Sequence, residues 1–330
     1  MVKVIYAREP PDPRFVLEPF EPLYLKLPGA ELERRAADAV GELACCRICP
    51  RRCGVDRLKG RLGFCRTGRD ARVTSAFAHP GEEDCLRGWN GSGTIFFGGC
   101  NLGCVFCQNC DISQTDAGAE SSTAELGRAM LHLQAGGCHN LNFVTPTHVV
   151  PQILEAVAWA VPRGFKLPIV YNCGGYESLE TLRRLDGVVD IYMPDFKFWE
   201  PGTAKRLANA EDYPDRARQA LAEMHRQVGV LRMGPDGLAR RGVLVRQLVM
   251  PGLVEESAAI YGWLARTLSR ETYVNIMGQY RPAHRVGDPG PDGRPLFADL
   301  MRRPTRDELR AAYAAAEQAG LWRLDERWRA

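Results

Sequence analysis

After Cys173 the chain contains no cysteine. All twelve of its cysteines lie between Cys45 and Cys173, so any chemistry that thiols perform belongs to roughly the first half of the sequence. The same absence argues against a cysteine-rich domain at the C-terminal end. In a long chain with a substantial apolar fraction, clustered thiols are more typical of metal ligands than of a disulfide framework.

Other common features are also missing. The first residues read MVKVIYAREPPDPRF, without the apolar core of a signal peptide. No apolar run approaches the roughly 18 residues that a transmembrane helix needs. The net charge is only +3, and no run of Lys and Arg is interleaved with aromatic residues as in a nucleic-acid-binding surface. We therefore expect a cytoplasmic protein with no membrane and no nucleic-acid partner.

The composition is that of a globular protein, with 45% hydrophobic and 25% charged residues in a chain of 330. This length allows one large domain or two modest ones. Residues 1–44 are rich in Pro and Glu and turn helical near 31–43, which indicates an N-terminal arm. We expect residues 45–93 to form a Cys-rich metal-binding extension and residues 94–330 to form the main domain.

Short apolar or β-branched runs alternate with amphipathic segments along the main domain. The expected strands are 94–97, 141–144, 169–171, 188–192, 243–249 and 273–277. Six strand–helix units in series indicate right-handed crossovers and a parallel sheet. Six units are too few for a closed eight-stranded barrel, so we expect an α/β fold with a partial (β/α)6 TIM-like barrel, and a doubly wound sheet is the alternative. In either fold the active site lies at the C-terminal ends of the strands.

Capping boxes predict where two of the intervening helices begin. Ser122 with Glu125 opens one, and Thr305 with Glu308 opens the last, which we expect to end at Gly320. The other expected helices are 149–160, 177–185, 214–228 and 255–268.

The densest motif follows the first expected strand. Residues 94–110 read TIFFGGCNLGCVFCQNC, in which a Gly pair lets the backbone turn sharply before Cys100, Cys104 and Cys107. Three thiolates at this spacing can ligate three irons of a cubane iron–sulfur cluster and leave the fourth iron without a protein ligand. A zinc-binding knuckle or a group of buried small thiols is the alternative interpretation.

This motif resembles the CxxxCxΦC signature of the radical S-adenosylmethionine (SAM) superfamily, in which Φ is aromatic and is matched here by Phe106. The resemblance implies a [4Fe–4S] cluster on Cys100, Cys104 and Cys107, with SAM on the open iron and Phe106 beside its adenine. One electron from the reduced cluster then cleaves SAM and releases a 5′-deoxyadenosyl radical. It also implies a partial barrel of the radical SAM type.

Cys110 extends the run to a fourth cysteine. A fourth thiolate on the same cluster would block SAM. We therefore expect Cys110 to be a buried small residue that does not ligate the cluster, with a redox or ligand role as the alternative.

Later strands resemble the branch that contains the pyruvate formate-lyase activating enzyme and its uncharacterised relatives. Similarity to the relatives covers most of residues 45–322, whereas similarity to the activase is confined to the barrel. Met193-Pro-Asp195-Phe-Lys197 resembles the activase's M-x-D-x-K run, which in that family holds SAM and a nearby monovalent cation. The segment around Arg246 resembles its I-R-x-V-V-x-P-G run, whose Arg contacts SAM.

Two further cofactor contacts are implied where the match is inexact. Tyr280, in NIMGQY, stands near a SAM-contacting His of the family, and Asn172 opens an Asn-Cys-Gly-Gly turn where the activase has an Asp-led turn. The family's GGE-type turn is replaced by VTPTH, in which Thr145 and Thr147 could supply oxygens. His148, at the end of this turn, either faces the substrate or is a hydrogen-bonded structural residue.

A second cysteine set lies upstream, in the segment CRICPRRCGVDRLKGRLGFC. Cys46, Cys49, Cys53 and Cys65 suit either a tetrahedral zinc site or an auxiliary [4Fe–4S] cluster, with Cys45 competing for the place of Cys46. The segment resembles the C-x-x-C-P-x-x-C element of the uncharacterised relatives. A reduced loop that binds nothing is the alternative. Flanking arginines would offset the thiolate charge: Arg47, Arg51, Arg52, Arg57, Arg61 and Arg66.

These patterns predict a radical SAM enzyme of oxidoreductase type whose substrate, a small molecule, a peptide or a protein, is unknown. We expect an electron donor such as flavodoxin or ferredoxin as a partner. A glycyl-radical-enzyme activase ranks lower, because the extra cysteines precede the barrel, unlike the ferredoxin insert of many such activases. A non-catalytic iron–sulfur electron carrier is the alternative from another class, and it would need no SAM pocket.

Overall fold

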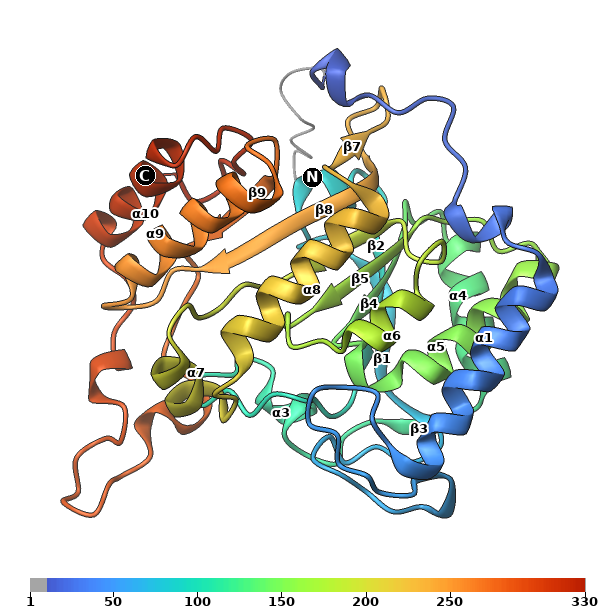
Figure 1. Ribbon diagram of the computed structural model, residues 1–330, viewed down its shortest axis with the longest axis horizontal. Helices are drawn as coiled ribbons and strands as arrows, with labels where there is room; N and C mark the ends of the chain where they lie inside the picture. Colours follow the sequence, from blue (N-terminus) through green and yellow to red (C-terminus); the bar gives the residue numbers. More distant parts are fainter. Residues whose placement is uncertain (1–10, 330) are drawn as a thin grey trace.

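The computed structural model describes residues 11–329. Within them, nine strands form one sheet in the order β3-β1-β2-β4-β5-β6-β8-β7, and β9 also pairs with β8 (Figure 1). Six of the strands are parallel and succeed one another in chain order: β2 (Ser92–Phe97), β4 (Leu141–Val144), β5 (Ile169–Cys173), β6 (Ile191–Pro194), β8 (Ala239–Leu248) and β9 (Tyr273–Met277).

These six strands are the six that the sequence predicts, although β6 begins three residues later than expected. A doubly wound sheet reverses its strand order at a switch point. The six parallel strands show no such reversal, because each one pairs with the next along the chain. The protein is therefore a mixed α/β protein with a central sheet that winds in one direction.

Helices fill the connections between these strands: α4 (Thr123–Ala135), α5 (Val150–Ala160), α6 (Leu179–Arg184), α7 (Pro201–Ala208), α8 (Tyr213–Val228) and α9 (Val254–Trp263), with α10 (Arg306–Gln318) after β9. Both predicted capping boxes are present, because Ser122 and Thr305 each exchange hydrogen bonds with the glutamate three residues later. Only α7 was not expected. It begins at a Pro-Gly pair and spans eight residues, which gives a weak periodic signal.

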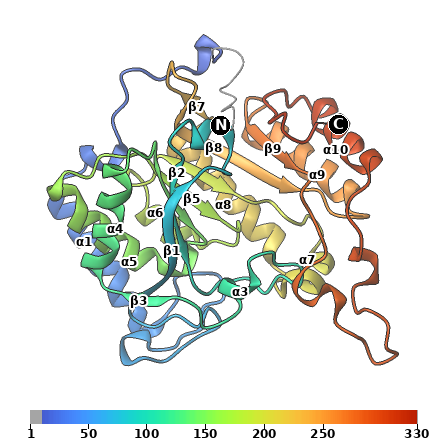
Figure 2. The same ribbon diagram turned by 180° about the vertical axis from the view of Figure 1, so that it is seen from behind.

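The N-terminal part is joined closely to this body. Helix α1 (Gly29–Gly41) packs on α5. Strand β1 (Ala71–His79) pairs antiparallel with β2, and β3 (Ala119–Ser121) pairs antiparallel with β1. The segment expected as an extension therefore adds a strand to the main sheet, as Figure 2 shows from behind.

The short elements were not predicted from the sequence. Strand β1 lies near the sheet edge and is largely half-buried or exposed, so it lacks a strict alternation of apolar and polar residues. Strand β7 (Arg232–Met233) has two residues, and helices α2 (Asp84–Arg87) and α3 (Cys110–Ser113) have four each. None of the helices between residues 11 and 329 combines the length and apolar character that a membrane crossing requires.

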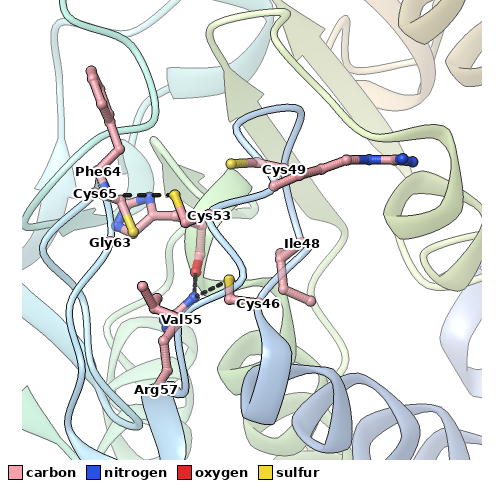
Figure 3. Close-up of a pocket in the computed structure, with 11 residues that line it drawn as sticks. Cys46, Ile48, Cys49, Cys53, Val55, Arg57, Gly63, Phe64 and Cys65 are labelled. Atoms are coloured by element: carbon pink, nitrogen blue, oxygen red, sulfur yellow. Dashed lines mark hydrogen bonds between the residues drawn. The ribbon is translucent and has the colours of Figure 1, made fainter.

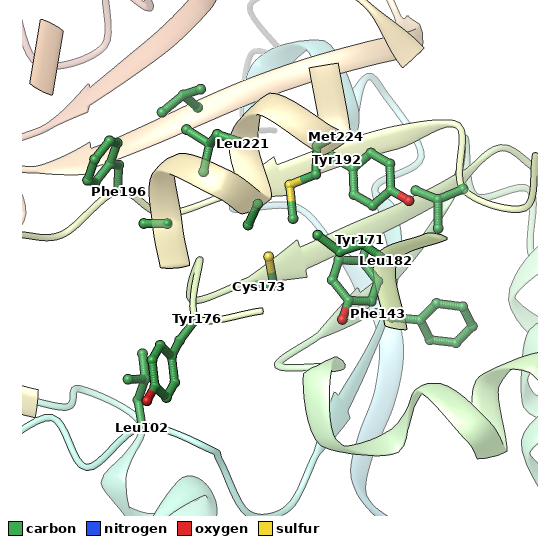
Figure 4. Close-up of a cluster of buried hydrophobic side chains, with 14 of the residues drawn as sticks. Leu102, Phe143, Tyr171, Cys173, Tyr176, Leu182, Tyr192, Phe196, Leu221 and Met224 are labelled. Atoms are coloured by element: carbon green, nitrogen blue, oxygen red, sulfur yellow. The ribbon is translucent and has the colours of Figure 1, made fainter. Parts of the chain in front are cut away.

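Both faces of the parallel sheet are buried. Tyr171 and Tyr192 point from one face toward α8, where Leu221 and Met224 complete the main core (Figure 4). On the opposite face a smaller apolar cluster lies among the strands, built around Val170, Ile191, Met193 and Leu244. Because side chains alternate along a strand, the same inner face also carries buried polar residues: Thr94, Asn142, Asn172 and Asn275. This polar inner face leads to the functional site.

Candidate functional site

The carboxyl ends of the six parallel strands meet at one cavity, of ≈ 960 Å³ including the space open to solvent. Each strand contributes at or just beyond its end: Cys100 after β2, Thr145 after β4, Asn172 from β5, Asp195 after β6, Arg246 from β8 and Met277 from β9. Parallel α/β sheets place their ligand sites at this edge. We call this space the three-cysteine cavity.

Three cysteines of the motif, Cys100, Cys104 and Cys107, line the three-cysteine cavity together. The backbone N–H of Leu102 donates to Cys100 Sγ over 3.3 Å, and the hydroxyl of Ser113 lies 3.1 Å from Cys107 Sγ. Hydrogen bonds of this kind stabilise sulfur in its anionic form. The loop therefore presents three thiols toward one space.

A glycine fixes the start of this loop. Gly99 has a φ of 79°, and a Cβ there would lie 2.3 Å from the carbonyl oxygen of Cys65. Only glycine accepts both the left-handed conformation and this close approach. The Gly pair that the sequence predicted as a sharp turn thus also brings the upstream cysteine segment against the motif.

Burial disfavours the anionic form of two of these cysteines, Cys100 and Cys104. Burial raises the pKa of Cys104 to about 12, although nearby Lys197 acts in the opposite direction. Burial likewise raises the pKa of Cys100. A metal that binds these sulfurs must therefore displace their protons.

Cys110 lies outside the wall of the three-cysteine cavity. It begins helix α3 and is half-buried, rather than fully buried as the sequence suggested. The donor set at this edge is therefore three sulfurs, which fits a cubane cluster with one iron left open.

A network of charges forms the other wall of the three-cysteine cavity. Arg246 donates through Nε to Asp195 Oδ1 at 2.8 Å and through Nη2 to Asn172 Oδ1 at 2.7 Å, and Lys197 is paired with the other oxygen of Asp195. The side chains of Asp195, Lys197 and Arg246 are only 14%, 16% and 16% exposed. These residues are therefore not a surface salt bridge.

The charged groups of this network stabilise one another in their ionised forms. Burial alone would raise the pKa of Asp195, but Arg246 and Lys197 keep it below its ordinary value. Burial alone would lower the pKa of Lys197, yet Asp195 and Cys104 raise it. At neutral pH this part of the wall presents the Asp195 carboxylate between the cations of Lys197 and Arg246.

Two buried glutamates, Glu82 and Glu83, lie beneath Arg246. Arg246 Nη1 lies 4.0 Å from Glu82 Oε1 and 3.7 Å from Glu83 Oε1. Asn142 donates to Glu82 and Asn275 to Glu83, over 2.6 and 3.1 Å. Burial and the adjacent Glu83 raise the pKa of Glu82 to about 8. Arg246 is thus shared among three carboxyl groups, a role that its strand motif does not reveal.

Two residues predicted as cofactor contacts lie behind the cavity wall. Met193 stands one pleat below Asp195 and belongs to the inner apolar cluster. The hydroxyl of Tyr280 donates to the Leu300 carbonyl at 2.9 Å, and its ring packs 6.2 Å from that of Phe106. Phe106 itself lines the cavity, as predicted.

Of the turn that replaces the family's GGE segment, Val144 and Thr145 line the cavity. Thr145 lines it with a φ of 58°, which is unusual for a β-branched residue. Thr147 instead donates to Glu177 at 2.6 Å, and Tyr171 donates to the same carboxyl group at 2.9 Å. Burial raises the pKa of Glu177 to about 7. The cavity wall also includes Gln108, Asn109 and Gln279, which no motif singled out.

The upstream cysteines line a second space, which we call the four-cysteine cavity. Cys46, Cys49, Cys53 and Cys65 surround ≈ 330 Å³ (Figure 3), whereas Cys45 is exposed and lies outside. Burial raises the pKa of Cys49 to about 12. Between residues 11 and 329, no three His, Cys, Asp or Glu side chains are grouped as ligands of a single metal ion. The four sulfurs therefore face a common space without converging on one point.

The arginines around this cavity are not equivalent. Arg57 is 1% exposed and donates to the Gly68 carbonyl at 3.0 Å, the His148 carbonyl at 2.8 Å and Cys46 Sγ at 3.8 Å. Its remaining nitrogen, Nη2, has no partner among the described residues. Arg57 thus places a buried cation against the cysteines, which favours their anionic, metal-binding form.

His148 lies at the four-cysteine cavity and not at the three-cysteine cavity. Its Nε2 is 2.9 Å from the carbonyl oxygen of Gly98, and burial lowers its pKa to about 4. It is a neutral structural residue that joins the cysteine loop to the end of β2. The three-cysteine and four-cysteine donor sets both fit metal ligation, because each gathers buried thiols beside a fixed cation.

Comparisons with known proteins place this architecture. No family model matches the chain. It is 31% identical over 286 residues to "Uncharacterized protein MJ0674" of Methanocaldococcus jannaschii, a match that covers 84% of this chain and 75% of that protein. The chain therefore belongs to the same family as this protein, whose name assigns no activity.

Two solved structures show a weaker likeness. Streptococcus suis SuiB matches with a TM-score of 0.44 and 10% identity over 67% of this chain. HydG, a maturase of the [FeFe]-hydrogenase, matches with a TM-score of 0.46 and 11% identity over 90% of this chain. The chain spans 44% of the first structure and 62% of the second, less than two thirds of either. A likeness at this level carries no argument about activity.

Proposed function

We propose that the chain is a radical SAM enzyme of oxidoreductase type that acts on an unidentified small molecule, peptide or protein. In this proposal the six parallel strands form a partial (β/α)6 barrel. The three-cysteine cavity holds a [4Fe–4S] cluster and SAM at its mouth. Residues 1–44 are an arm, 45–93 a cysteine-rich extension and 94–330 the barrel.

One observation carries the proposal. The three cysteines and Phe106 share a cavity with Asn172, with the ion pairs of Asp195, and with nothing contributed by Cys110. These residues come from separate segments spread over residues 100–246, and the motifs predicted that they would act together. An electron carrier needs no such wall of charged groups opposite its cluster.

In this proposal, different residues of the three-cysteine cavity contact different parts of SAM. When bound, the cluster supplies the electron that cleaves SAM into methionine and a 5′-deoxyadenosyl radical. Lys197 and Arg246 offer donors to a carboxylate or a ribose, and each charge-assisted bond contributes about 1.5–3 kcal/mol. Asp195 holds both cations in place, Asn172 orients Arg246, and Phe106 provides an apolar surface for the adenine. Met193 and Tyr280 support this wall from behind.

The upstream cysteines are the second part of the proposal. The four-cysteine cavity holds zinc or an auxiliary iron–sulfur cluster, and it binds its metal independently of the three-cysteine cavity. The two spaces have separate cysteines, and Arg57 serves only the upstream one. A pyruvate formate-lyase activase-like role remains the runner-up for the substrate, because nothing at the cavity selects a protein loop over a small molecule.

Anaerobic reconstitution with iron and sulfide, followed by SAM and dithionite, tests the proposal. The enzyme should release 5′-deoxyadenosine, and the EPR signal of its reduced cluster should shift when SAM is added. A carrier would show a reduced cluster whose signal ignores SAM and would form no 5′-deoxyadenosine. That result would overturn the proposed activity. Deuterium uptake into 5′-deoxyadenosine from labelled candidates then identifies the substrate.

A further inference from the structure

We propose that the four-cysteine cavity holds a redox-active iron–sulfur cluster, not zinc, and that this cluster accepts electrons from a small acidic one-electron carrier and passes them to the three-cysteine site. The proposal rests on the proposed function, because it assigns the source of the electron that SAM cleavage consumes. Four observations support it: the shape of the donor set, the shared wall between the two cavities, the hydrogen bonds that join them, and the surface around Cys53.

The shape of the donor set favours a cluster. Zinc requires four ligands at about 2.3 Å from one point. No group of three His, Cys, Asp or Glu side chains within residues 11–329 approaches that arrangement. The sulfurs of Cys46, Cys49, Cys53 and Cys65 instead stand around a common space (Figure 3). A cubane cluster suits such a spread, because each thiolate binds a different iron at a different corner.

The two cavities share a wall that is one backbone thick. The carbonyl of Cys65 touches Gly99, where an added Cβ would lie 2.3 Å from its oxygen. Cys65 belongs to the upstream set, and Gly99 is bonded to Cys100 of the other set. Cys65 and Cys100 also line one hollow together with Arg66 and Gln114. A ligand of one site therefore stands directly beside a ligand of the other.

Hydrogen bonds provide a second connection. Arg57 contacts Cys46 Sγ at 3.8 Å and the His148 carbonyl at 2.8 Å, and His148 Nε2 lies 2.9 Å from the Gly98 carbonyl. Gly98 precedes Cys100 by two residues. A zinc site that only stabilised its own loop would not need the contacts through Arg57 and His148 to the loop of the other cluster. Both contacts hold the two cysteine loops close together. Two redox centres in these loops would exchange electrons faster, because the rate of electron transfer falls steeply with distance.

The surface around Cys53 is suited to a donor protein. Cys53 is exposed, unlike the other three cysteines of its cavity. Leu58, Leu62 and Phe64 are 43%, 55% and 39% exposed, and they account for three of the nine large apolar side chains found exposed among the described residues. Basic residues of the same loop are exposed around them: Arg52, Lys59, Arg61 and Arg66. We call these seven residues the basic apolar patch.

This patch selects a partner by charge. The acids nearby, Asp56, Asp116 and Glu180, reach Lys59, Arg66 and Arg52 at 3.4, 3.9 and 3.5 Å, which leaves the loop cationic overall. Apolar groups ringed by cations are typical of a docking site for an acidic protein. The occupant is a reduced flavodoxin or ferredoxin with an acidic face, since the exposed thiol beneath the patch would bring its redox group close to the upstream cluster.

The electron balance is simple. The reduced carrier loses one electron, which the upstream cluster gains and then loses to the cluster at Cys100, Cys104 and Cys107. That electron breaks the sulfonium bond of SAM, so one carrier is oxidised for each methionine and each 5′-deoxyadenosyl radical formed. No proton is transferred in these steps.

The decisive experiment uses the full chain with Cys100→Ala, Cys104→Ala and Cys107→Ala combined. After anaerobic reconstitution it should retain roughly four irons per chain, as a [4Fe–4S] cluster does, and it should oxidise reduced flavodoxin in a stopped-flow mixer as fast as the wild type. Zinc in place of iron, the absence of metal, or no oxidation of flavodoxin would each overturn the proposal. This readout involves no SAM, so it is separate from a failure of the proposed function.

A second pair of variants tests delivery to the active site. Cys53→Ala removes an upstream ligand, and Cys45→Ala is its matched control, since Cys45 is an exposed neighbouring thiol outside the cavity. With dithionite, which can enter the open three-cysteine cavity, both should form 5′-deoxyadenosine. With reduced flavodoxin, only Cys53→Ala should lose activity. Equal activity of both variants with flavodoxin would contradict the relay, and loss with both reductants would assign the upstream site a structural role.

The docking face has its own test. Arg61→Glu should raise the concentration of flavodoxin needed for half-maximal rate by about threefold to tenfold at low salt, and the difference should shrink at high salt. Arg310→Glu on α10, at the far end of the molecule (Figure 1), is the matched control. The patch is not the docking site if the two variants respond alike.

Discussion

The two cysteine-lined cavities differ in how their arginine is used. At the four-cysteine cavity, Arg57 reaches a sulfur directly and bonds otherwise only to backbone carbonyls. At the three-cysteine cavity, Arg246 bonds Asp195 and Asn172 and stays clear of the cysteines. The first arrangement neutralises a closed set of ligands. The second prepares a charged wall opposite an incomplete set, which is what a site needs if a small molecule is to complete it.

The largest expected effect removes one ligand from the incomplete set. Cys104→Ala should abolish SAM-dependent formation of 5′-deoxyadenosine, because two thiolates cannot hold a cluster of this type in place. The measurement is chromatography of 5′-deoxyadenosine after anaerobic incubation with SAM and dithionite. Metal at the four-cysteine cavity should persist, which shows that the chain is folded. Continued SAM cleavage by this variant would refute the assignment of the cavity.

The next effect comes from the charged wall. Arg246→Ala leaves three carboxyl groups without their shared cation, and breaking a buried pair costs about 3–5 kcal/mol. We expect a lower melting temperature and, at unchanged iron content, SAM binding weaker by about tenfold to a hundredfold. EPR titration of the reduced cluster with SAM measures the affinity.

Lys197→Met separates affinity from stability at the same wall. Asp195 keeps its bond to Arg246 in this variant, so the loss of stability should be smaller than in Arg246→Ala. SAM binding should still weaken by about tenfold, because one charge-assisted bond is lost. SAM affinity equal to that of the wild type would mean that Lys197 serves only Asp195.

A smaller effect is expected at the closed set. Arg57→Met removes the cation beside Cys46, so a chelator should strip metal from the four-cysteine cavity faster while the three-cysteine cavity keeps its iron. Arg51→Met is the matched control, because the Arg51 guanidinium bonds carbonyls of Asn101 and Asn209 and not a sulfur. Iron release followed by absorbance distinguishes the two. Similar release rates would show that the charge of Arg57 is unimportant for metal retention.

The smallest effect tests the boundary of the three-cysteine cavity. Cys110→Ser should leave iron content, SAM affinity and 5′-deoxyadenosine formation unchanged, since Cys110 lies outside the cavity wall. Loss of iron on this substitution would make Cys110 a fourth ligand and would leave no open position for SAM.

The sequence predicted the parts of the site that depend on local order. Cysteine spacing grouped the residues that line each of the two cavities, and strand periodicity brought Asn172, Asp195 and Arg246 to one edge, because the ends of parallel strands must meet there. It did not predict the depth of Met193, which shares a face with Asp195 but lies one pleat lower, in the inner apolar cluster. How deeply a strand residue is buried depends on which distant segments pack over it. A single sequence does not show which segments these are.

Contacts between distant segments were also beyond the sequence. The pairing of Arg246 with Glu82 and Glu83 joins β8 to the segment before α2, and the contact between Cys65 and Gly99 joins two cysteine segments that looked independent. Strand β1 was missed for the same reason, since its partner β2 and not its own pattern makes it a strand. In each case tertiary packing decides the structure and local propensity does not.

The confinement of all cysteines to residues 45–173 has a consequence during synthesis. The thiols are synthesised before β6, β8 and β9, yet Asp195, Arg246 and the far wall of the three-cysteine cavity come from these strands or directly after them. About 100 residues separate Cys173 from the end of β9, which takes about 5–20 s at usual translation rates. During that interval the cysteines of residues 45–173 have been made but the far wall of the three-cysteine cavity has not, so iron loading or oxidative damage can begin before that wall shields the site.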